Sequence, residues 1–331
     1  MRPELSIVTP TFNRHERLGR VLLALEQQTI ARERFEVVVV DDGSTDGTAE
    51  WLAGRAYTFP LRLLRQQNSG PAKARNAGVQ AATSDLILFL DDDVVPVPEL
   101  VAEHLSSHAD PQTPAVVMGP LASLPHYAQP WVAWEQAQVE KQYVAMQRGD
   151  YEPSFRQFWT GNASVARQHL LAAGLFNAEH KRGEDIELGF RLFERGLKFR
   201  FNPRARGLHH AERSLDSWQH AHESYGTLEV ELFGKLGEDS LLKMLAENFA
   251  RLNPASQWLL RRTLGHGLRE RALQKALRAY LESSAAVRSG KISNRACSLL
   301  ANLLYWRASA EALGAPRFAE VMRRVDVIRS S

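Results

Sequence analysis

The sequence predicts an α/β fold in which a mostly parallel central sheet is flanked by helices, followed by a mainly α-helical C-terminal region. Up to residue 90, short apolar runs alternate with helical patterns, which is typical of parallel strands joined by right-handed crossovers. From residue 214 onward, apolar side chains recur at helical spacing instead. The chain of 331 residues is longer than a usual single domain, so two regions are expected.

Four apolar or β-branched runs are expected to form strands, because buried strands have this composition. They cover residues 5–8, 35–40, 61–64 and 86–90. Helices are expected between them, over 18–25, from about Thr48, and over about 72–82. Polar segments follow the runs at 9–13, 41–47, 68–71 and 91–93. The carboxyl ends of parallel strands share one edge of a sheet, so a ligand cleft is expected there.

Three consecutive aspartates, Asp91, Asp92 and Asp93, follow the fourth apolar run without a spacer. Adjacent carboxylates repel one another, so a positive partner is expected nearby. A divalent cation that holds a phosphate is the simplest candidate, because Mg²⁺ typically takes one or two carboxylates plus phosphate oxygens. An acidic turn after a strand is the alternative interpretation.

The ordered segments SIVTPTFNR, FEVVVVDDGSTDGT, NSGPAKARNAG and LILFLDDDV resemble the family 2 glycosyltransferases, which are nucleotide-sugar-dependent enzymes of the GT-A fold. Downstream, WTGNASVAR and RGEDIELGFRLFERG are similar to that family's acceptor-side Gly-Asn loop and Glu-Asp motif. The resemblance covers residues 4–215. It implies a GT-A domain over 1–213, with a nucleotide-binding half (1–110) and an acceptor-side half (111–213). A helical region over 214–331 would follow.

The resemblance implies a metal site and a nucleotide site. Asp93 would bind Mn²⁺ or Mg²⁺ directly, while Asp91 contacts the ribose or a metal-bound water and Asp92 flanks them. A late histidine, His209 or His210, would join the metal shell, although such a pair can also pack or cap. The residues expected to bind the nucleotide sugar are Thr9, Pro10, Thr11, Asp41, Asp42, Gly70, Lys73, Arg75, Asp91 and Asp92.

Among these, Asp41 or Asp42 would accept a hydrogen bond from uracil or ribose, which favours UDP as the nucleotide. A capping role beside Ser44 is the alternative. Lys73 and Arg75 lie where a loop opens a helix, a place suited to phosphate or ribose, but both could be surface charges.

The acceptor side is expected in the second half of the domain. The acceptor hydroxyl must lose its proton as it attacks, and the resemblance implies Asp185 as the general base. Glu184 would bind the acceptor or orient the helix, although acids in a first helical turn are favoured by the helix dipole in any case. Trp159, Gly161 and Asn162 are expected to contact a sugar ring, with a core position as the alternative for Trp159.

The C-terminal region is expected to form five or six helices, with breaks near Gly237, 253–254, 265–267, 289–290 and 314–316. Its basic residues accompany two aromatic residues in a pattern that fits a surface facing anionic lipid, and helical packing or homodimerisation explains the same pattern. They are Arg261, Arg262, Arg269, Arg271, Lys275 and Arg278, with Trp258 and Tyr280.

Composition sets limits on location and partners. The net charge of +3 comes without long Lys/Arg blocks or zinc-ligand spacing, which argues against a nucleic-acid partner. The lone cysteine, Cys297, excludes an internal disulfide framework. With no signal-peptide pattern and no apolar run of about 18 residues, we expect a cytoplasmic protein, peripheral to the inner face of the membrane if the helices bind lipid.

These features together predict a metal-dependent, inverting glycosyltransferase that uses a UDP-sugar and a glycan, lipid-linked or other hydroxyl acceptor, in cell-surface glycan synthesis. Two other functions stay open. LILFLDDDVV also matches the nucleophile motif of haloacid-dehalogenase-like phosphatases, although three strand-like runs precede it here. A non-catalytic protein that binds nucleotide sugars is the second.

Overall fold

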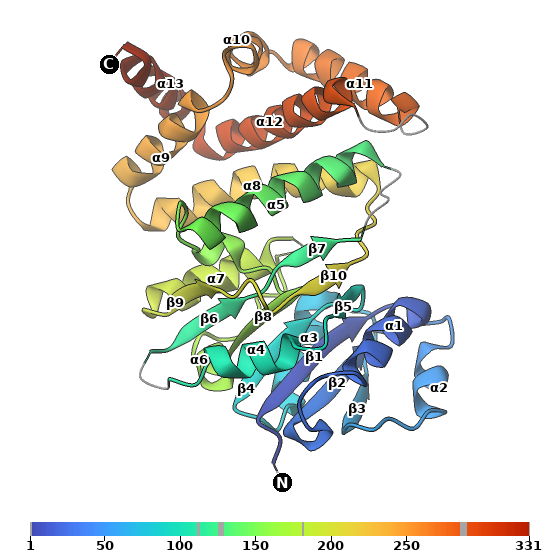
Figure 1. Cartoon of the computed structure of the whole chain (residues 1–331). Coiled ribbons are helices and arrows are strands. Elements are labelled where there is room, and N and C mark those ends of the chain that lie inside the picture. The colour runs from blue at the N-terminus through green and yellow to red at the C-terminus, as the bar shows by residue number, and fades with distance from the viewer. Residues whose placement is uncertain (1, 111–112, 125–128, 181, 285–289, 331) are drawn as a thin grey trace. The chain divides into compact units, whose positions relative to one another are not determined.

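The computed structural model describes residues 2–110, 113–124, 129–180, 182–284 and 290–330. The chain forms two compact units (Figure 1). One comprises Met1–Pro125 with Gln138–Ala211, and the other comprises His126–Ala137 with Glu212–Ser331. Each unit has its own hydrophobic core.

The first unit is built on a seven-stranded sheet of order β3-β2-β1-β4-β8-β6-β9. Its strands are β1 (Leu5–Thr11), β2 (Phe35–Asp41), β3 (Leu61–Arg65), β4 (Leu86–Leu90), β6 (Ala115–Met118), β8 (Asn162–Ala166) and β9 (Lys198–Phe201). β8 runs antiparallel to β4 and β6, and the other neighbouring pairs are parallel. The mostly parallel sheet and the strand–helix alternation predicted from the sequence are therefore confirmed.

A second, three-stranded sheet has the order β5-β10-β7, with β5 (Val94–Pro96), β7 (Leu121–Ser123) and β10 (Gly207–His209). β10 pairs antiparallel with β5, so that His209 lies opposite Val94. These three-residue strands are too short to leave a periodic pattern in the sequence, so hydrophobic periodicity does not predict them. Their pairing brings the chain near residue 209 back to the segment that follows the aspartate triplet.

Helices cover the large sheet. They are α1 (His15–Leu25), α2 (Thr48–Ala53), α3 (Pro71–Ala81), α4 (Leu100–Ser107), α6 (Arg167–Ala172) and α7 (Glu184–Glu194), with 3-10 turns η1 (Arg32–Arg34) and η2 (Phe155–Gln157). A further helix, α5 (Pro130–Arg148), begins in the second unit and ends in the first. The apolar face of α1 joins the core beside Ile7 and Val37. On α3, a Cβ added to Gly78 would stand 2.3 Å from a methyl carbon of Val8, so this glycine permits close helix–strand approach. Both faces of the strands are thus buried, which explains their unbroken apolar runs.

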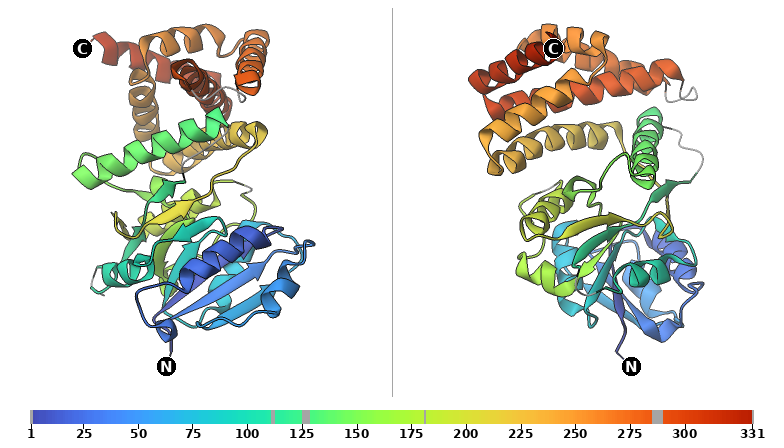
Figure 2. Two further views of the ribbon diagram at one scale, coloured as in Figure 1. Left: turned by 45° about the vertical axis from the view of Figure 1, so that its right-hand side comes forward. Right: turned by 60° about the vertical axis from the view of Figure 1, so that its left-hand side comes forward.

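The second unit is helical (Figure 2). It contains α8 (Leu215–Lys235), α9 (Glu238–Ala250), α10 (Pro254–Thr263), α11 (Gly267–Ser284), α12 (Lys291–Leu313) and α13 (Ala315–Ser330). α12 packs along α8, where a Cβ on Gly226 would stand 2.3 Å from the carbonyl oxygen of Tyr305. Trp306 and Phe249 meet edge to face in its core, at 4.9 Å between ring centroids. The helical C-terminal region predicted from the sequence is confirmed.

Candidate active site

The loops that follow β1 and β2 are tied together at the carboxyl edge of the sheet. The Asn13 backbone N–H donates to Ser44 Oγ over 2.9 Å, and Asn13 Oδ1 accepts from the Thr45 N–H over 2.8 Å. Asn13 has a φ of 54°, a left-handed conformation that asparagine tolerates better than most residues. Thr11 Oγ1 then donates to Asp92 Oδ2 over 2.7 Å, which links the same edge to the end of β4.

Arginines compensate the charge of the aspartate triplet. Arg14 Nη1 lies 3.1 Å from Asp92 Oδ1 and 3.2 Å from Asp93 Oδ2, and Arg17 Nη1 lies 3.9 Å from Asp93 Oδ2. Burial raises the pKa of Asp92 to about 6 although Arg14 opposes the shift, and burial with the charge of Asp91 raises the pKa of Asp93. Roles for Arg14 and Arg17 are not predicted from the sequence, although Arg14 ends the SIVTPTFNR segment at this edge.

His209 lies beside the triplet. Its Nε2 is 3.6 Å from Asp93 Oδ1, whereas His210 uses its backbone N–H to donate to the Asp93 carbonyl over 2.9 Å. The His209 ring is thus close to a carboxylate of the triplet. Among the described residues, no three or more His, Cys, Asp or Glu side chains gather closely enough to hold a metal ion by themselves. A carboxylate and an imidazole would suit Mn²⁺ or Mg²⁺ if phosphate oxygens completed its shell.

Asp41, the last residue of β2, and Asp42, which follows it, differ in the number of hydrogen bonds that their carboxylates accept. Asp42 accepts hydrogen bonds from Gln66 Nε2 and from the Ser69 and Gly70 N–H groups, so its carboxylate shapes the loop before α3. Asp41 Oδ1 accepts from the Ser44 N–H over 2.8 Å. Within the described residues, the buried Asp41 Oδ2 accepts no hydrogen bond, although Arg65 Nε lies 3.5 Å from it as an ion-pair partner.

The remaining residues predicted to bind the nucleotide also lie at or near this edge. Thr9 is fully buried on β1, and its Oγ1 has no hydrogen-bond partner among the described residues. Pro10 is half-buried next to it. Lys73, in contrast, is exposed on α3, as a surface charge would be. Asp41 and Thr9 are consequently the side chains here with hydrogen-bonding capacity to spare.

Arg75 joins the two halves of the site. Its buried guanidinium donates to Asp91 Oδ1 over 2.8 Å and to Glu184 Oε1 over 3.0 Å. Gly161 lies on the other side of Asp91, where an added Cβ would stand 3.2 Å from Asp91 Oδ2. The Arg75 guanidinium on α3 thus connects the aspartate triplet with the Glu-Asp motif. These segments are far apart in the sequence.

Asp185 lies in the first turn of α7, next to this ion-pair cluster. Its Oδ1 accepts from the Ile186 N–H over 2.8 Å. Burial and the charge of Glu184 raise the pKa of Asp185 to about 7, while Arg75 opposes the shift. A carboxylate with a pKa near neutrality is well matched to accept a proton at that pH.

Asn162 is part of the core. Its Nδ2 donates to the Ala205 carbonyl over 2.8 Å, while its Oδ1 faces His104 Nε2 at 2.9 Å. The Oδ1 must accept, so His104 donates from Nε2 and, being neutral, accepts at Nδ1 from the Ser164 hydroxyl 2.8 Å away. Burial lowers the pKa of His104 to about 4, in agreement with a neutral ring. These bonds tie β8 to the turn before β10, the strand that carries His209.

The Asn162→Ala variant is expected to lose stability, because the Ala205 carbonyl and the His104 N–H would lose buried partners. We expect a loss of about 2–4 kcal/mol in the free energy of unfolding, measured by urea denaturation. Asn294→Ala, at an exposed position of α12, serves as the control and should change it by less than about 0.5 kcal/mol. A variant as stable as the wild type but with weaker acceptor binding would instead support the acceptor contact predicted from the sequence.

Trp159, the other predicted acceptor residue, is half-buried, and its ring meets Tyr143 edge to face at 5.9 Å between centroids. Tyr143 in turn stacks on Phe201, and its hydroxyl accepts from the Leu121 N–H over 3.0 Å. The Trp159 ring therefore packs against Tyr143 while part of the Trp159 side chain is exposed to solvent. This position agrees with a plate for a sugar ring and does not require a purely structural role.

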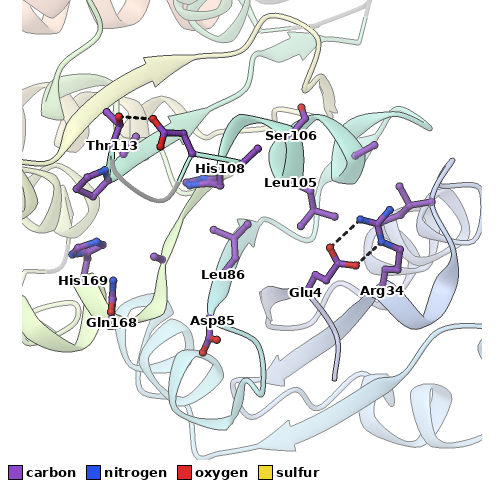
Figure 3. A pocket seen from close by; sticks show the side chains of 17 residues that line it. Glu4, Arg34, Asp85, Leu86, Leu105, Ser106, His108, Thr113, Gln168 and His169 are labelled. Carbon is purple, nitrogen blue, oxygen red and sulfur yellow. Dashed lines mark hydrogen bonds and ion pairs between the residues drawn. The ribbon is translucent and has the colours of Figure 1, made fainter. Parts of the chain in front are cut away.

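A cavity of about 700 Å³ lies elsewhere in the first unit (Figure 3). Asp85, Leu86 and Ala115, which line it, stand at the amino ends of β4 and β6. The aspartate triplet lies at the opposite, carboxyl end of β4, so this cavity is separate from the ion-pair cluster. His108 on its wall is 2.8 Å from Ser164 Oγ and extends the hydrogen-bond chain of His104.

Residues 6–169 match the model of glycosyl transferase family 2. The chain contains a family 2 glycosyltransferase domain. This result confirms the family predicted from the ordered motifs, and the phosphatase alternative is not supported. In the structure, the strand before the aspartate triplet is β4, the fourth along the chain. The nucleophile motif of the phosphatases would be expected after the first strand.

Relatives and solved structures agree with this family. Validoxylamine A glucosyltransferase of Streptomyces hygroscopicus subsp. limoneus is 34% identical over 224 residues, covering 59% of this chain and 49% of the relative. The chain thus spans about half the length of this relative. The glycosyltransferase domain and the helices after it also share their fold with two solved structures.

The first is the mannosyltransferase PcManGT of Pyrobaculum calidifontis in complex with GDP-Man and Mn²⁺. Its TM-score is 0.54 at 21% identity, over 99% of this chain and 86% of that one. The second is S. aureus TarS 1–349 in complex with UDP-GlcNAc, with a TM-score of 0.56 at 18% identity, over 100% of this chain and 92% of that one. Both likenesses confirm the GT-A fold.

Proposed function

We propose that this protein is a metal-dependent, inverting glycosyltransferase that moves a sugar from a UDP-linked donor to a hydroxyl acceptor in cell-surface glycan synthesis. The observation that carries the proposal is the Arg75 guanidinium, which contacts Asp91 of the triplet and Glu184 of the Glu-Asp motif. A base beside Glu184 can thereby act on an acceptor that approaches a donor held near Asp91.

On the donor side, Asp93 and His209 would hold Mn²⁺ or Mg²⁺, with Asp91 contacting the ribose or a metal-bound water. Bound there, the cation would neutralise charge on the departing diphosphate. Arg14 and Arg17 already face the same carboxylates and can turn toward the diphosphate oxygens. Asp41 Oδ2, with no hydrogen bond among the described residues, suits the imide N–H of uracil.

On the acceptor side, Asp185 would take the proton of the acceptor hydroxyl while the oxygen of that hydroxyl attacks the anomeric carbon. The bond from that carbon to the diphosphate breaks in the same displacement, so the configuration inverts. Arg75 forms an ion pair with Glu184, so Glu184 would not act as the base and Asp185 would. Trp159 offers an aromatic face to a sugar ring. Each group thus has one role that its charge and neighbours support.

Known ligands of similar proteins guide the choice of donor. The PcManGT structure contains GDP-Man and Mn²⁺, and the TarS structure contains UDP-GlcNAc. Both are nucleoside diphosphate sugars, which supports that class for this chain. The Asp41 carboxylate favours UDP within the class. The buried thiol of Cys297, the single cysteine, suits a reducing compartment such as the cytoplasm.

A thermal-shift screen of UDP-, GDP-, ADP- and dTDP-linked sugars, with Mn²⁺ or with EDTA, tests the proposal. A ligand that binds only the folded protein raises its melting temperature, so UDP-sugars with Mn²⁺ should give the largest rise. Release of UDP on addition of acceptors would then establish transfer. A rise with no turnover over a broad acceptor panel would favour a non-catalytic binding protein. No rise with any nucleotide sugar would reject the proposal.

A further inference from the structure

The turn between α10 and α11 brings exposed apolar side chains together with basic ones. Trp258 on α10 is 56% exposed, and Leu268 on α11 is 80% exposed. Single exposed apolar residues are ordinary on a protein surface, so exposure alone indicates nothing. The neighbours of these two residues are what distinguish the site.

Three arginines surround them. The Arg262 guanidinium lies over the Trp258 ring, 4.4 Å from its centroid, and Arg269 Nη1 donates to the Arg262 carbonyl over 3.3 Å. Arg271 extends back over the turn, since its Nη2 would stand 3.9 Å from a Cβ built on Gly267. Trp258, Arg262, Leu268, Arg269 and Arg271 are all exposed on α10 and the first turns of α11, and this group is here termed the Trp258 surface.

Negative charge is scarce around this patch. Between residues 252 and 281 the only acid is Glu270, which is buried and accepts a hydrogen bond from the Gly265 N–H over 2.7 Å. Arg262, Arg269 and Arg271 make no ion pair with any described residue. Their charges therefore face solvent uncompensated.

Of the other basic residues in the predicted lipid-facing pattern, Arg261 and Arg278 are paired within the helical unit, whereas Lys275 is exposed and makes no ion pair with a described residue. Arg261 pairs with Asp326 at 2.8 Å, and Arg278 pairs with Asp216 and with Glu282. Some basic residues of this stretch thus form ion pairs within the helical unit, and the others keep their charges exposed to solvent. Only the second set is available to a partner.

Packing within the helical unit does not account for the patch. α10 buries a different set of side chains, Ser256, Gln257, Leu260 and Thr263. Trp258 therefore lies on the opposite, unpartnered side of a helix whose inner face is already filled. Trp258 and Arg262 on α10, with Arg269 and Arg271 on α11, match the interface of an anionic bilayer, where indole rings lie at headgroup level and arginines reach the phosphates. Within the described part of the chain, none of the helices has the length and hydropathy needed to cross that bilayer.

We propose that the Trp258 surface docks on an anionic phospholipid membrane. Trp258 and Leu268 enter the headgroup region, while Arg262, Arg269 and Arg271 bind lipid phosphates. This inference goes beyond sugar transfer and concerns the helical unit alone. Its test measures lipid binding rather than catalysis, so a protein without transferase activity could still pass it, and an active transferase could fail it.

Co-sedimentation of the full chain with phosphatidylcholine vesicles, with and without phosphatidylglycerol, tests the proposal. The wild type should sediment with the anionic vesicles only, and less at high salt. The triple variant R262E/R269E/R271E should bind at least about 100-fold more weakly, since each basic residue contributes about a fivefold factor. W258A/L268A should bind about tenfold more weakly, because apolar area no longer enters the headgroups.

A charge-matched control keeps the test specific. Lys243, Lys291 and Arg295 are exposed basic residues on α9 and α12, and the triple variant K243E/K291E/R295E should keep wild-type lipid binding. Far-UV circular dichroism and melting temperature establish that each variant is folded. Equal binding to neutral and anionic vesicles, or an equal loss in the control, would overturn the proposal. Self-association that W258A/L268A abolishes, without lipid binding, would overturn it too and assign the surface to a second copy.

Discussion

Replacing Asp185 with asparagine is expected to lower the rate of sugar transfer by about 10²- to 10⁴-fold and to leave binding of the nucleotide sugar unchanged. Asparagine has nearly the same shape but cannot accept the proton of the acceptor hydroxyl. Initial rates of UDP release with acceptor, and titration calorimetry with donor alone, measure the two quantities. Asp150→Asn, the same change in an exposed turn, is the control and should leave both unchanged.

The dependence on pH provides a second readout of Asp185. Its pKa is raised to about 7, so the wild-type rate should increase as the pH rises through about 7 and then level off. A carboxyl whose pKa is raised on folding favours the folded state at low pH, and this contribution is lost as the pH rises through its folded-state pKa. Asp185→Asn should accordingly be more stable than the wild type at about pH 8, by on the order of 1–2 kcal/mol, with a smaller gain at about pH 5. Transfer at the wild-type rate by the asparagine variant would refute the assignment of Asp185 as the base.

Replacing Asp93 with asparagine is expected to abolish metal-dependent donor binding and to lower transfer by about 10³-fold or more, because a bound cation supplies several kcal/mol of charge stabilisation. Titration of Mn²⁺ in the presence of UDP, followed by calorimetry, measures the loss. The carboxyl is buried next to Asp91, and its raised pKa means that its charge costs stability, so the variant should also melt at a higher temperature.

Asp92→Asn is the matched control in the same triplet. Asp92 accepts from Thr11 and Arg14, and it is expected to act within the loop rather than on the cation. This variant should keep a Mn²⁺-dependent response to UDP even if its melting temperature changes. Were Asp92→Asn to lose metal dependence while Asp93→Asn kept it, the metal assignment of the two residues would have to be exchanged.

Local patterns predicted the elements up to residue 90 closely. The run at 86–90 is β4, the β-branched run at 35–40 lies within β2, and the helix expected from about Thr48 is α2. Each of these depends on neighbours a few residues away, through alternation, helical spacing and turn residues. The breaks expected near Gly237, Pro254 and Gly314 lie at the starts of α9, α10 and α13 for the same reason.

The hydrogen-bond and ion-pair partners of the site residues could not be predicted in this way, because they come from distant parts of the chain. The sequence marks Asn162 as part of a motif but does not reveal that its amide faces the Ala205 carbonyl and His104. Arg75 was predicted at phosphate or ribose as a cation near a helix start, whereas in the structure it contacts Asp91 and also Glu184, which is 109 positions away in the chain. No spacing rule predicts such a contact, because it depends on how three loops pack.

From the sequence by itself came the α/β fold, the edge at which polar segments gather and the family of the catalytic domain, since local periodicity and ordered motifs carry that information. The tertiary structure alone decided that the His209 ring lies near Asp93, and that Arg262 stays exposed while Arg261 pairs with Asp326. Those outcomes depend on strand pairing and helix packing between distant segments. The burial that results also determines which carboxyl groups have raised pKa values.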